Sequence, residues 1–328
     1  MTRLLVTRPI PDEGIKMLRR SRKVVIDQYK PDRVMPREEL LRRARKADVI
    51  LSILTDKMDA ELFNAAPRLK MIANYAVGFD NIDLKEAKKR GITVAHTRYA
   101  GISESVAEHA IGLMLALAHR LVEADRFMRD GKYEAWGPRM LLGADLIGKT
   151  VGVIGTGAIG TGIIRRLHDG FGVKVVYNDV KRNQTLEETM DARFLSKDAL
   201  LKTADFISLH VPLLPSTRHM IGARELKLMK KTAFLINTSR GPVVDAHALT
   251  RALARRQIGG AGLDVYECEP NVACDAKDSM QMIKLPNVVL TPHTASATIE
   301  TRQAMSRAAA RNILAFLEGK TPPDLVDA

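Results

Sequence analysis

A glycine pattern near the middle of the chain constrains the fold more than any other feature of the sequence. Gly155, Gly157 and Gly160 directly follow an apolar run at residues 150–154 and precede an amphipathic helical pattern. In such a pattern the first glycine permits a tight turn, the second permits close backbone approach, and the third lets the helix pack on the strand. The pattern therefore predicts a strand, a turn and a helix that open a βαβ unit of a parallel sheet.

The same glycines predict a dinucleotide-binding site, because the N-terminus of the following helix would point at a pyrophosphate. A second apolar run ends at Asp179, where a carboxylate would accept hydrogen bonds from the hydroxyls of the adenosine ribose. A carboxylate at this position repels a 2′-phosphate, so we expect the cofactor to be NAD. Lys181 and Arg182 follow closely, and NADP therefore remains an alternative.

Short apolar runs alternate with amphipathic stretches in two series, one before about residue 100 and one from about residue 149 to residue 286. Each series predicts a parallel α/β unit. Between them, residues 105–128 form one long apolar helical pattern, which we expect to be buried between domains or against another subunit. A helical pattern at residues 298–317 closes the chain. The strands of the second unit already complete its sheet, so we place this last helix on the first unit. That placement makes the first domain discontinuous.

The charge of the chain is strongly positive but unevenly distributed. The net charge is +13, and residues 1–50 contain 14 Lys and Arg against 7 Asp and Glu. The basic run at residues 42–46 lies on a helical pattern without interleaved aromatic side chains. We interpret it as a solvated helix face and expect no nucleic-acid partner. The remaining alternative is a general attraction of small anionic substrates.

The cysteine and hydropathy patterns indicate a reduced compartment and no membrane span. Cys268 and Cys274 form no CxxC pair and have no histidine at metal-ligand spacing, so we expect reduced cysteines and no metal site. The N-terminal segment is charged from its third residue onward, unlike a signal peptide. No window approaches the roughly 18 apolar residues that span a bilayer. We therefore expect a cytoplasmic protein.

Three polar residues follow short apolar runs downstream of the glycines. Arg240, Glu269 and His293 come after runs at residues 233–237, 261–266 and 288–291. Because ligands bind outside the carboxyl ends of parallel strands, these side chains would open onto one crevice. An arginine suits a carboxylate with an adjacent carbonyl, an imidazole can protonate that carbonyl, and a carboxylate would orient the imidazole and favour its charged form. This trio is our catalytic hypothesis.

Beyond these features, the chain resembles the D-isomer specific 2-hydroxyacid dehydrogenases over essentially its whole length. The resemblance is carried by motifs at residues 77–83 (VGFDNID), 105–109 (SVAEH), 145–150 (DLIGKT), 210–213 (HVPL), 237–241 (NTSRG), 262–265 (GLDV) and 291–293 (TPH). The stretches around Tyr75 and Trp136 are most similar to the glyoxylate/hydroxypyruvate reductase branch of that family.

The resemblance implies an α/β protein with a Rossmann NAD-binding domain at residues 99–289. It implies a discontinuous, flavodoxin-like substrate domain at residues 1–98 and 290–328. The implied reaction transfers a hydride between NAD(P)H and a small 2-oxo or 2-hydroxy acid, with glyoxylate or hydroxypyruvate favoured. In it, Arg240 grips the substrate carboxylate, His293 donates the proton and Glu269 partners His293. The family also implies a homodimer, formed largely through the apolar helix and the arm around Trp136.

The resemblance assigns further binding residues. The cofactor contacts that it implies are Gly155, Gly157, Ala158, Ile159, Gly160, Asp179, Val211, Pro212, Thr217, Thr238, Ser239, Asp264 and Ser103. The substrate contacts that it implies are Tyr75, Val77, Gly78, Arg240 and His293. Ala158 departs from the family, which usually has an arginine between the second and third glycines, and this departure would cost a phosphate contact.

Two other functions stay open. A D-3-phosphoglycerate dehydrogenase without a regulatory domain would suit the basic N-terminal region, and an NAD-sensing corepressor-like binding protein would keep a similar trio. The remaining histidines have structural interpretations. We interpret His109 and His119, on the long apolar helical pattern, as packed or capped, and His210 as bordering the cofactor without reacting.

Overall fold

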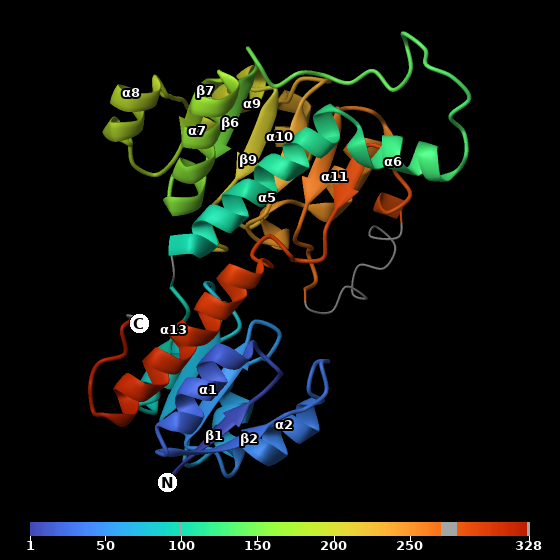
Figure 1. Cartoon of the computed structure of the whole chain (residues 1–328). Coiled ribbons are helices and arrows are strands. Elements are labelled where there is room, and N and C mark those ends of the chain that lie inside the picture. The colour runs from blue at the N-terminus through green and yellow to red at the C-terminus, as the bar shows by residue number, and fades with distance from the viewer. Residues whose placement is uncertain (99, 270–280, 327–328) are drawn as a thin grey trace. The chain divides into compact units, whose positions relative to one another are not determined.

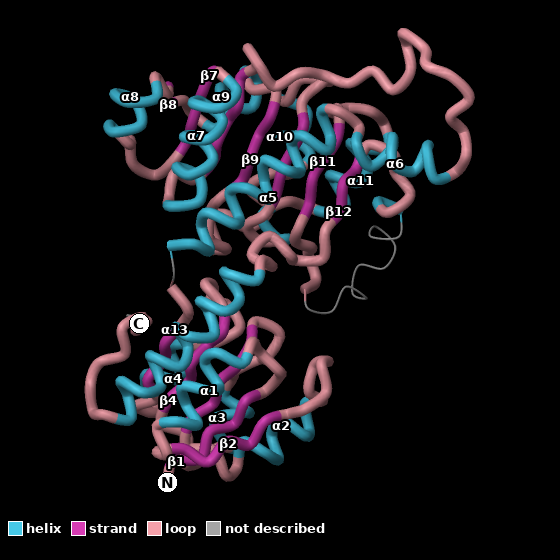
Figure 2. The backbone as a smooth tube through the Cα atoms, in the orientation of Figure 1, coloured by secondary structure: helices cyan, strands magenta, loops and turns pink. Residues whose placement is uncertain are grey.

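The computed structural model describes residues 1–98, 100–269 and 281–326. These residues form two compact units (Figures 1 and 2). The first unit comprises Met1–Ile102 and Ala297–Ala328, and the second comprises Ser103–Ser296.

The first unit is built around a parallel sheet with the strand order β2-β1-β3-β4-β5 in the described residues. This is the flavodoxin-like order of a doubly wound α/β fold, as predicted. Its strands are β1 (Thr2–Val6), β2 (Val24–Gln28), β3 (Val49–Ile53), β4 (Met71–Tyr75) and β5 (Thr93–Ala95), and its helices are α1 (Asp12–Arg20), α2 (Arg37–Ala44), α3 (Ala60–Ala65), α4 (Leu84–Lys89) and α13 (Ile299–Leu317).

The closing helix α13 returns to the first unit and packs against α1, so the predicted discontinuous fold is confirmed (Figure 1). The two helices approach closely because Gly14 has no side chain. A Cβ at Gly14 would overlap the backbone carbonyl of Ser306. The Ser306 hydroxyl donates a hydrogen bond to the carbonyl of Pro11 and accepts one from the N–H of Gly14 at 3.0 Å. The contact between α1 and α13 therefore joins the N-terminal and C-terminal segments of the chain in one unit.

The second unit contains a longer parallel sheet with the order β12-β11-β10-β9-β6-β7-β8 among the described residues. Its strands are β6 (Thr150–Ile154), β7 (Lys174–Asn178), β8 (Arg193–Phe194), β9 (Phe206–Leu209), β10 (Phe234–Asn237), β11 (Gly260–Leu263) and β12 (Val288–Leu290). Its helices are α5 (Ala100–Ala118), α6 (Leu121–Arg129), α7 (Ala158–Phe171), α8 (Gln184–Met190), α9 (Lys197–Thr203), α10 (Ala223–Leu228) and α11 (Ala246–Ala254), with a short 3₁₀ helix η1 (Gly241–Val243).

The strand order reverses beside β6, which lies between β7 and β9. Such a switch point opens a crevice at the carboxyl ends of the strands, where ligands of doubly wound folds bind. The glycine pattern directly follows β6. The predicted Rossmann arrangement is therefore confirmed, with the glycines at the switch point.

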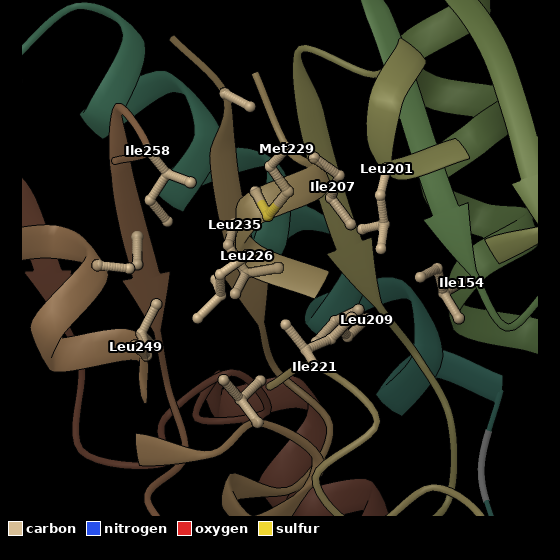
Figure 3. Packing of buried hydrophobic residues seen from close by; sticks show 14 of the residues in the cluster. Ile154, Leu201, Ile207, Leu209, Ile221, Leu226, Met229, Leu235, Leu249 and Ile258 are labelled. Carbon is tan, nitrogen blue, oxygen red and sulfur yellow. The ribbon is translucent and has the colours of Figure 1, made fainter. Parts of the chain in front are cut away.

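Both faces of this sheet are covered by apolar packing. Successive residues of one strand point to opposite faces, so Phe206 packs on the side of α5 and α7 while Ile207 packs on the other side. On that other side, Leu201, Leu226 and Leu249 from three helices fill the space over the strands (Figure 3). A sheet buried on both faces is a rigid base for residues at its strand ends.

The apolar pattern at residues 105–128 does not form one helix, contrary to the prediction. Helix α5 ends at Ala118 and α6 begins at Leu121, because Arg120 takes a left-handed conformation with φ of 54°. Its guanidinium donates to Glu123 and to the carbonyl of Leu142, which stabilises the break. The α5 part is buried against the sheet of its own unit, whereas α6 has no buried residue. Burial between domains or against another subunit stays a prediction.

The boundary between the two units differs from the one predicted. The second boundary between the units lies after Ser296, so residues 290–296 belong to the second unit and not to the first. The reason is that this segment is hydrogen-bonded to Asp264 of the second unit.

Cys268 is disulfide-bonded, so the expectation of a reduced side chain is wrong for it. Cys274 lies outside the described residues.

Among the described residues, no single helix is both long and apolar enough to cross a membrane. Residues Gly101–Ala118 and Leu121–Arg129 meet that criterion only as a pair, and the pair is bent by 61°.

Candidate active site

The glycine loop has the geometry that close approach of a ligand requires. Gly155 has a φ of 94°, and a Cβ there would overlap the carbonyl of His210. A Cβ at Gly160 would overlap the carbonyl of Gly155, so the first and third glycines are required by packing within the protein. A Cβ at Gly157 would meet no atom within 4 Å. The second glycine therefore faces open space, as expected where a pyrophosphate approaches the N-terminus of α7.

The two residues after Gly157 complete the first turn of α7. Ala158 is exposed and Ile159 is half-buried. The methyl group of Ala158 provides no donor for a phosphate, so backbone N–H groups of the loop are the donors available at this end of the helix. Ser103, the other predicted contact near this region, is half-buried on α5.

Asp179 follows β7 and braces the glycine loop. Its Oδ2 accepts hydrogen bonds from the backbone N–H of Thr156 at 2.6 Å and from the Thr156 hydroxyl at 2.8 Å. Its Oδ1 accepts one from the N–H of Val180 at 2.7 Å. Burial alone would raise the pKa of the Asp179 carboxyl, but these hydrogen bonds from Thr156 and Val180, with one from the Lys181 backbone, lower it. The ionised carboxylate can accept hydrogen bonds from ribose hydroxyls.

The two cations after Asp179 differ in their surroundings. Arg182 pairs with Glu187 at 2.6 Å, and its guanidinium lies 5.8 Å from the centre of the Phe194 ring. Its charge is therefore already partnered within the second unit. Lys181 is exposed.

The loop after β9 is closed by Thr217. The Thr217 hydroxyl donates to the carbonyl of Pro212 at 2.6 Å and accepts a hydrogen bond from the N–H of Leu214 at 2.8 Å. Val211 packs against the buried cluster beneath the loop. The structure thus gives Thr217 a role in shaping the loop that carries Val211 and Pro212.

Two buried polar atoms near the switch point have no partner within the described residues. They are Nδ1 of His210, at the end of β9, and Oγ1 of Thr238, at the end of β10. The other ring nitrogen of His210 bonds to the Ser208 hydroxyl at 2.7 Å, and burial lowers the pKa of His210 to about 3. Unsatisfied buried groups are costly in a folded protein. Together with the open face of Gly157, they fit a polar cofactor along this edge of the sheet.

Arg240 lies in the turn after β10. Asn237 holds this turn, since its amide donates to the carbonyl of Arg240 at 2.9 Å and its carbonyl oxygen accepts from the Ser239 hydroxyl at 2.8 Å. The Arg240 guanidinium donates to the carbonyl of Ser239 at 2.8 Å. A Cβ at Gly241 would overlap the backbone of Tyr266, so this glycine lets the Arg240 turn approach the segment after β11.

Asp264 is completely buried at the end of β11 and binds the segment after β12. Its Oδ1 accepts hydrogen bonds from the Thr291 hydroxyl at 2.6 Å and from the N–H of Thr294 at 2.8 Å. Its Oδ2 accepts one from the N–H of Ala295 at 2.8 Å. The sequence predicted a cofactor contact for Asp264. In the structure its carboxylate is surrounded by protein donors and shapes the loop at residues 291–295.

His293 and Glu269 form a direct pair. Nδ1 of His293 lies 2.5 Å from Oε2 of Glu269, and Oε1 of Glu269 accepts a hydrogen bond from the N–H of Tyr266 at 3.1 Å. The side chains are 28% and 20% exposed, so the outer nitrogen Nε2 can reach a ligand. His293 has a left-handed φ of 55°, which Asp264 supports by accepting its N–H through the backbone carbonyl at 2.8 Å. Strained backbone of this kind is typical of functional sites.

The structure therefore brings the predicted trio to three neighbouring strand ends. Arg240, Glu269 and His293 follow β10, β11 and β12, which are adjacent in the sheet. The sheet beneath them is buried, so its strands hold the backbone at these ends, and a cation, a carboxylate and an imidazole lie along one edge of the sheet. Among the described residues, no group of three or more His, Cys, Asp or Glu side chains is placed to hold a metal ion.

The predicted substrate contacts Tyr75, Val77 and Gly78 lie in the first unit, at the end of β4. Tyr75 is buried and its hydroxyl donates to the carbonyl of Arg302 at 2.7 Å, and burial raises the pKa of Tyr75 to about 12. The next turn is fixed through its carbonyls, which accept from His96 at Val77 and from Asn74 at Gly78. Among the described residues, the N–H groups of Val77 and Gly78 donate to no backbone carbonyl.

One participant in the site was assigned differently from the sequence. His109, interpreted as packed or capped, reaches the Thr291 hydroxyl with Nε2 at 2.9 Å, and Nε2 lies 3.5 Å from Oδ1 of Asp264. Its spacing on an apolar helix gave no sign of this contact, because the partners are far away in the sequence.

A glycine loop at the switch point and an imidazole–carboxylate pair on neighbouring strand ends define a dinucleotide-dependent oxidoreductase. Residues 111–295 match the family model described as D-isomer specific 2-hydroxyacid dehydrogenase, NAD binding domain. The chain is 46% identical to a glyoxylate reductase from Thermococcus litoralis over 99% of this chain and 96% of that protein. The chain belongs to the D-isomer specific 2-hydroxyacid dehydrogenase family.

Solved structures agree with this assignment. The TT0316 protein from Thermus thermophilus is similar with a TM-score of 0.91 and 40% identity, covering 99% of this chain and 100% of that one. An NADPH-dependent glyoxylate/hydroxypyruvate reductase from Sinorhizobium meliloti, in complex with NADP and malonate, has a TM-score of 0.83 and 32% identity, covering 99% and 96%. The chain is thus an oxidoreductase of this family with an NAD-binding domain.

Proposed function

We propose that the protein reduces glyoxylate, and to a lesser extent hydroxypyruvate, to the corresponding 2-hydroxy acid with NADH. The observation that carries the proposal is the His293–Glu269 pair, which lies on the same edge of the sheet as Arg240 and the glycine loop. The names of the relatives from Thermococcus litoralis and Sinorhizobium meliloti support the choice of these two acids.

In the proposed mechanism each residue of the trio has one task. The guanidinium of Arg240 binds the substrate carboxylate with two parallel N–H donors and orients the adjacent carbonyl. Nε2 of His293 donates a proton to the carbonyl oxygen as that oxygen becomes an alkoxide. Glu269 accepts from Nδ1, which directs Nε2 outward and stabilises the positive charge of the imidazolium. When bound, the reduced cofactor would supply the hydride that the carbonyl carbon of the substrate accepts.

The Val77–Gly78 turn of the first unit is our candidate for a second group that binds the substrate carboxylate. Two backbone N–H groups that donate to no backbone carbonyl of the described residues, on a turn with fixed carbonyls, are suited to an anion. The first unit would then serve as the substrate domain, and the second as the cofactor domain.

We propose NAD as the preferred cofactor. The lowered pKa of Asp179 keeps its carboxyl ionised, and at the end of β7 this charge would accept the ribose hydroxyls and repel a 2′-phosphate. Arg182, which would otherwise attract that phosphate, is paired with Glu187. The exposed Lys181 leaves some affinity for NADP.

Steady-state kinetics test the substrate and the cofactor together. Oxidation of NADH and of NADPH would be followed with glyoxylate, hydroxypyruvate, pyruvate and phosphohydroxypyruvate. We expect the highest kcat/KM for glyoxylate with NADH. Preferred turnover of phosphohydroxypyruvate would instead identify a phosphoglycerate dehydrogenase. NADH binding without turnover of any of the four acids would favour a cofactor-sensing binding protein.

We also propose that the protein is a homodimer. The subunits would associate through α6 and through the segment at residues 130–149 that follows it, which we call the arm. Trp136, Leu142 and Ile147 on this arm are 77%, 65% and 72% exposed, and Met128 on α6 is 57% exposed. Large exposed apolar side chains concentrated in one segment of the chain are typical of an interface between subunits. Light scattering after gel filtration should give twice the chain mass of 36.3 kDa. Replacing Trp136 and Leu142 with glutamate should give the monomer mass, and a monomeric wild-type protein would contradict the proposal.

A further inference from the structure

His109 links helix α5 to the loop that carries the proposed proton donor. Its Nε2 lies 2.9 Å from the Thr291 hydroxyl and 3.5 Å from Oδ1 of Asp264, and its side chain is 24% exposed. The three residues come from α5, from the end of β12 and from the end of β11. This contact joins a covering helix to two strand ends of the site.

The hydrogen-bond directions in this chain of groups follow from simple chemistry. Both oxygens of Asp264 accept backbone N–H groups, from Thr294 and Ala295, so the carboxylate acts as an acceptor. The Thr291 hydroxyl has one proton and donates it to Asp264 at 2.6 Å. Toward His109 the same hydroxyl can therefore only accept. Nε2 of His109 must then carry a proton, in either the neutral or the charged ring.

The same carboxylate determines the backbone of the proton donor. Asp264 holds the N–H groups of Thr294 and Ala295 through its side chain and the N–H of His293 through its carbonyl. These hydrogen bonds hold His293 at a left-handed φ of 55°. A rotation of the Asp264 carboxylate would release the loop, and the Thr291 hydroxyl oriented by His109 opposes that rotation.

We propose that His109 is a positioning residue for reduction: through Thr291 and Asp264 it holds the loop at residues 291–295 so that His293 meets the substrate carbonyl. This inference rests on the proposed function, since it assigns His293 as the proton donor. His109 itself touches neither the substrate nor the reacting atoms in this scheme. Its effect is on the geometry of proton transfer, for which a displacement of about 1 Å can cost roughly a hundredfold in rate.

Matched variants separate positioning from packing. In H109L the donor is lost, whereas in H109Q the amide nitrogen can still donate to Thr291. In T291V the hydroxyl is lost, whereas in T291S it is kept. We expect H109L and T291V to lower kcat for glyoxylate by about tenfold to a hundredfold, with H109Q and T291S staying within about threefold of wild type. The Kd for NADH should be unchanged in all four, because none of them alters the glycine loop.

The exposed His119, which directly follows α5, provides the control. H119L should have wild-type kcat. A wild-type kcat in H109L, or an H109Q protein as impaired as H109L, would overturn the positioning role. A kcat loss in H109L that merely follows a reduced folded fraction, measured by circular dichroism, would overturn it as well.

A second measurement does not depend on turnover. With ¹⁵N-labelled histidine, the Nε2 resonance of His109 should show a bound proton in the wild type across the neutral pH range. A ring with its proton on Nδ1 alone would overturn the proposed direction of the hydrogen bonds. If the wild type reduces none of the tested acids, the proposed function fails while this measurement still decides whether the His109–Thr291 contact exists.

Discussion

At the scale of single residues, the proposed chemistry depends on a short contact between Nδ1 of His293 and Oε2 of Glu269, at 2.5 Å. In the proposed mechanism the imidazole provides the proton, and the carboxylate provides both orientation and charge. Removing each contribution separately should therefore give graded losses of activity.

We expect H293A to lose at least about a hundredfold in kcat, because general acid catalysis contributes on the order of 10² to 10⁴ in rate. E269Q keeps an acceptor for Nδ1 but removes the charge, so it should lose less, about tenfold. Steady-state kinetics and fluorescence titration with NADH check both variants. Loss of NADH binding in H293A would show that the residue has a role other than proton transfer.

The residues of the trio could be predicted because each one lies three to six residues after a strand that an apolar run forms. Parallel strands bring their carboxyl ends to one edge, so sequence order alone brings Arg240, Glu269 and His293 together. His109 could not be predicted in the same way. Its partner Thr291 is 182 positions away along the chain, and a histidine on an apolar helix is usually a packing residue. Likewise, nothing in the motif at Asp264 shows that its carboxylate binds three groups of one loop.

At the scale of elements, the alternation of apolar and amphipathic runs was enough to predict both parallel sheets and the return of the last helix to the first unit. The break between α5 and α6 was not predictable, because apolar residues continue on both sides of it. It depends on the left-handed backbone of Arg120 and on the contact of its guanidinium with the Leu142 carbonyl of the arm. Helical periodicity carries no information about such tertiary contacts.

The crossing of α1 and α13 is the element contact most sensitive to a small change. In G14A, the added methyl group would overlap the Ser306 carbonyl, so the two helices must separate. We expect the free energy of unfolding to fall by about 1–3 kcal/mol, the usual cost of overpacking. Urea unfolding followed by circular dichroism measures it. As a control, G112A on α5 adds a methyl group in open space and should be neutral or stabilising, since alanine favours a helix. Equal stability of G14A and wild type would mean that the helices do not cross this closely.

At the scale of the whole molecule, stability should depend on pH through groups whose pKa differs between the folded and unfolded states. Desolvation raises the pKa of Asp48 in the first unit and of Asp205 in the second, but hydrogen bonds and ion pairs outweigh it and lower both. Their stabilising contribution is present at neutral pH and is lost as the pH falls through their folded pKa values. Burial lowers the pKa of His210 from 6.5 to about 3, so this histidine affects stability over a range of pH that extends well above that of the carboxylates.

Between pH 6.5 and pH 3 the unfolded chain binds a proton at His210 that the folded protein does not bind, so acidification in this range favours unfolding. At pH 5 the resulting loss of stability is about 2 kcal/mol relative to pH 7. H210Q keeps a side-chain amide that can bond to the Ser208 hydroxyl and cannot titrate, so its stability should fall less over the same range. Urea unfolding of both proteins at pH 7 and pH 5 measures the difference. H119Q, which removes an exposed histidine, should behave like the wild type. The carboxylates titrate equally in all three proteins, so identical losses in the wild type and H210Q would show that His210 is protonated in the folded protein.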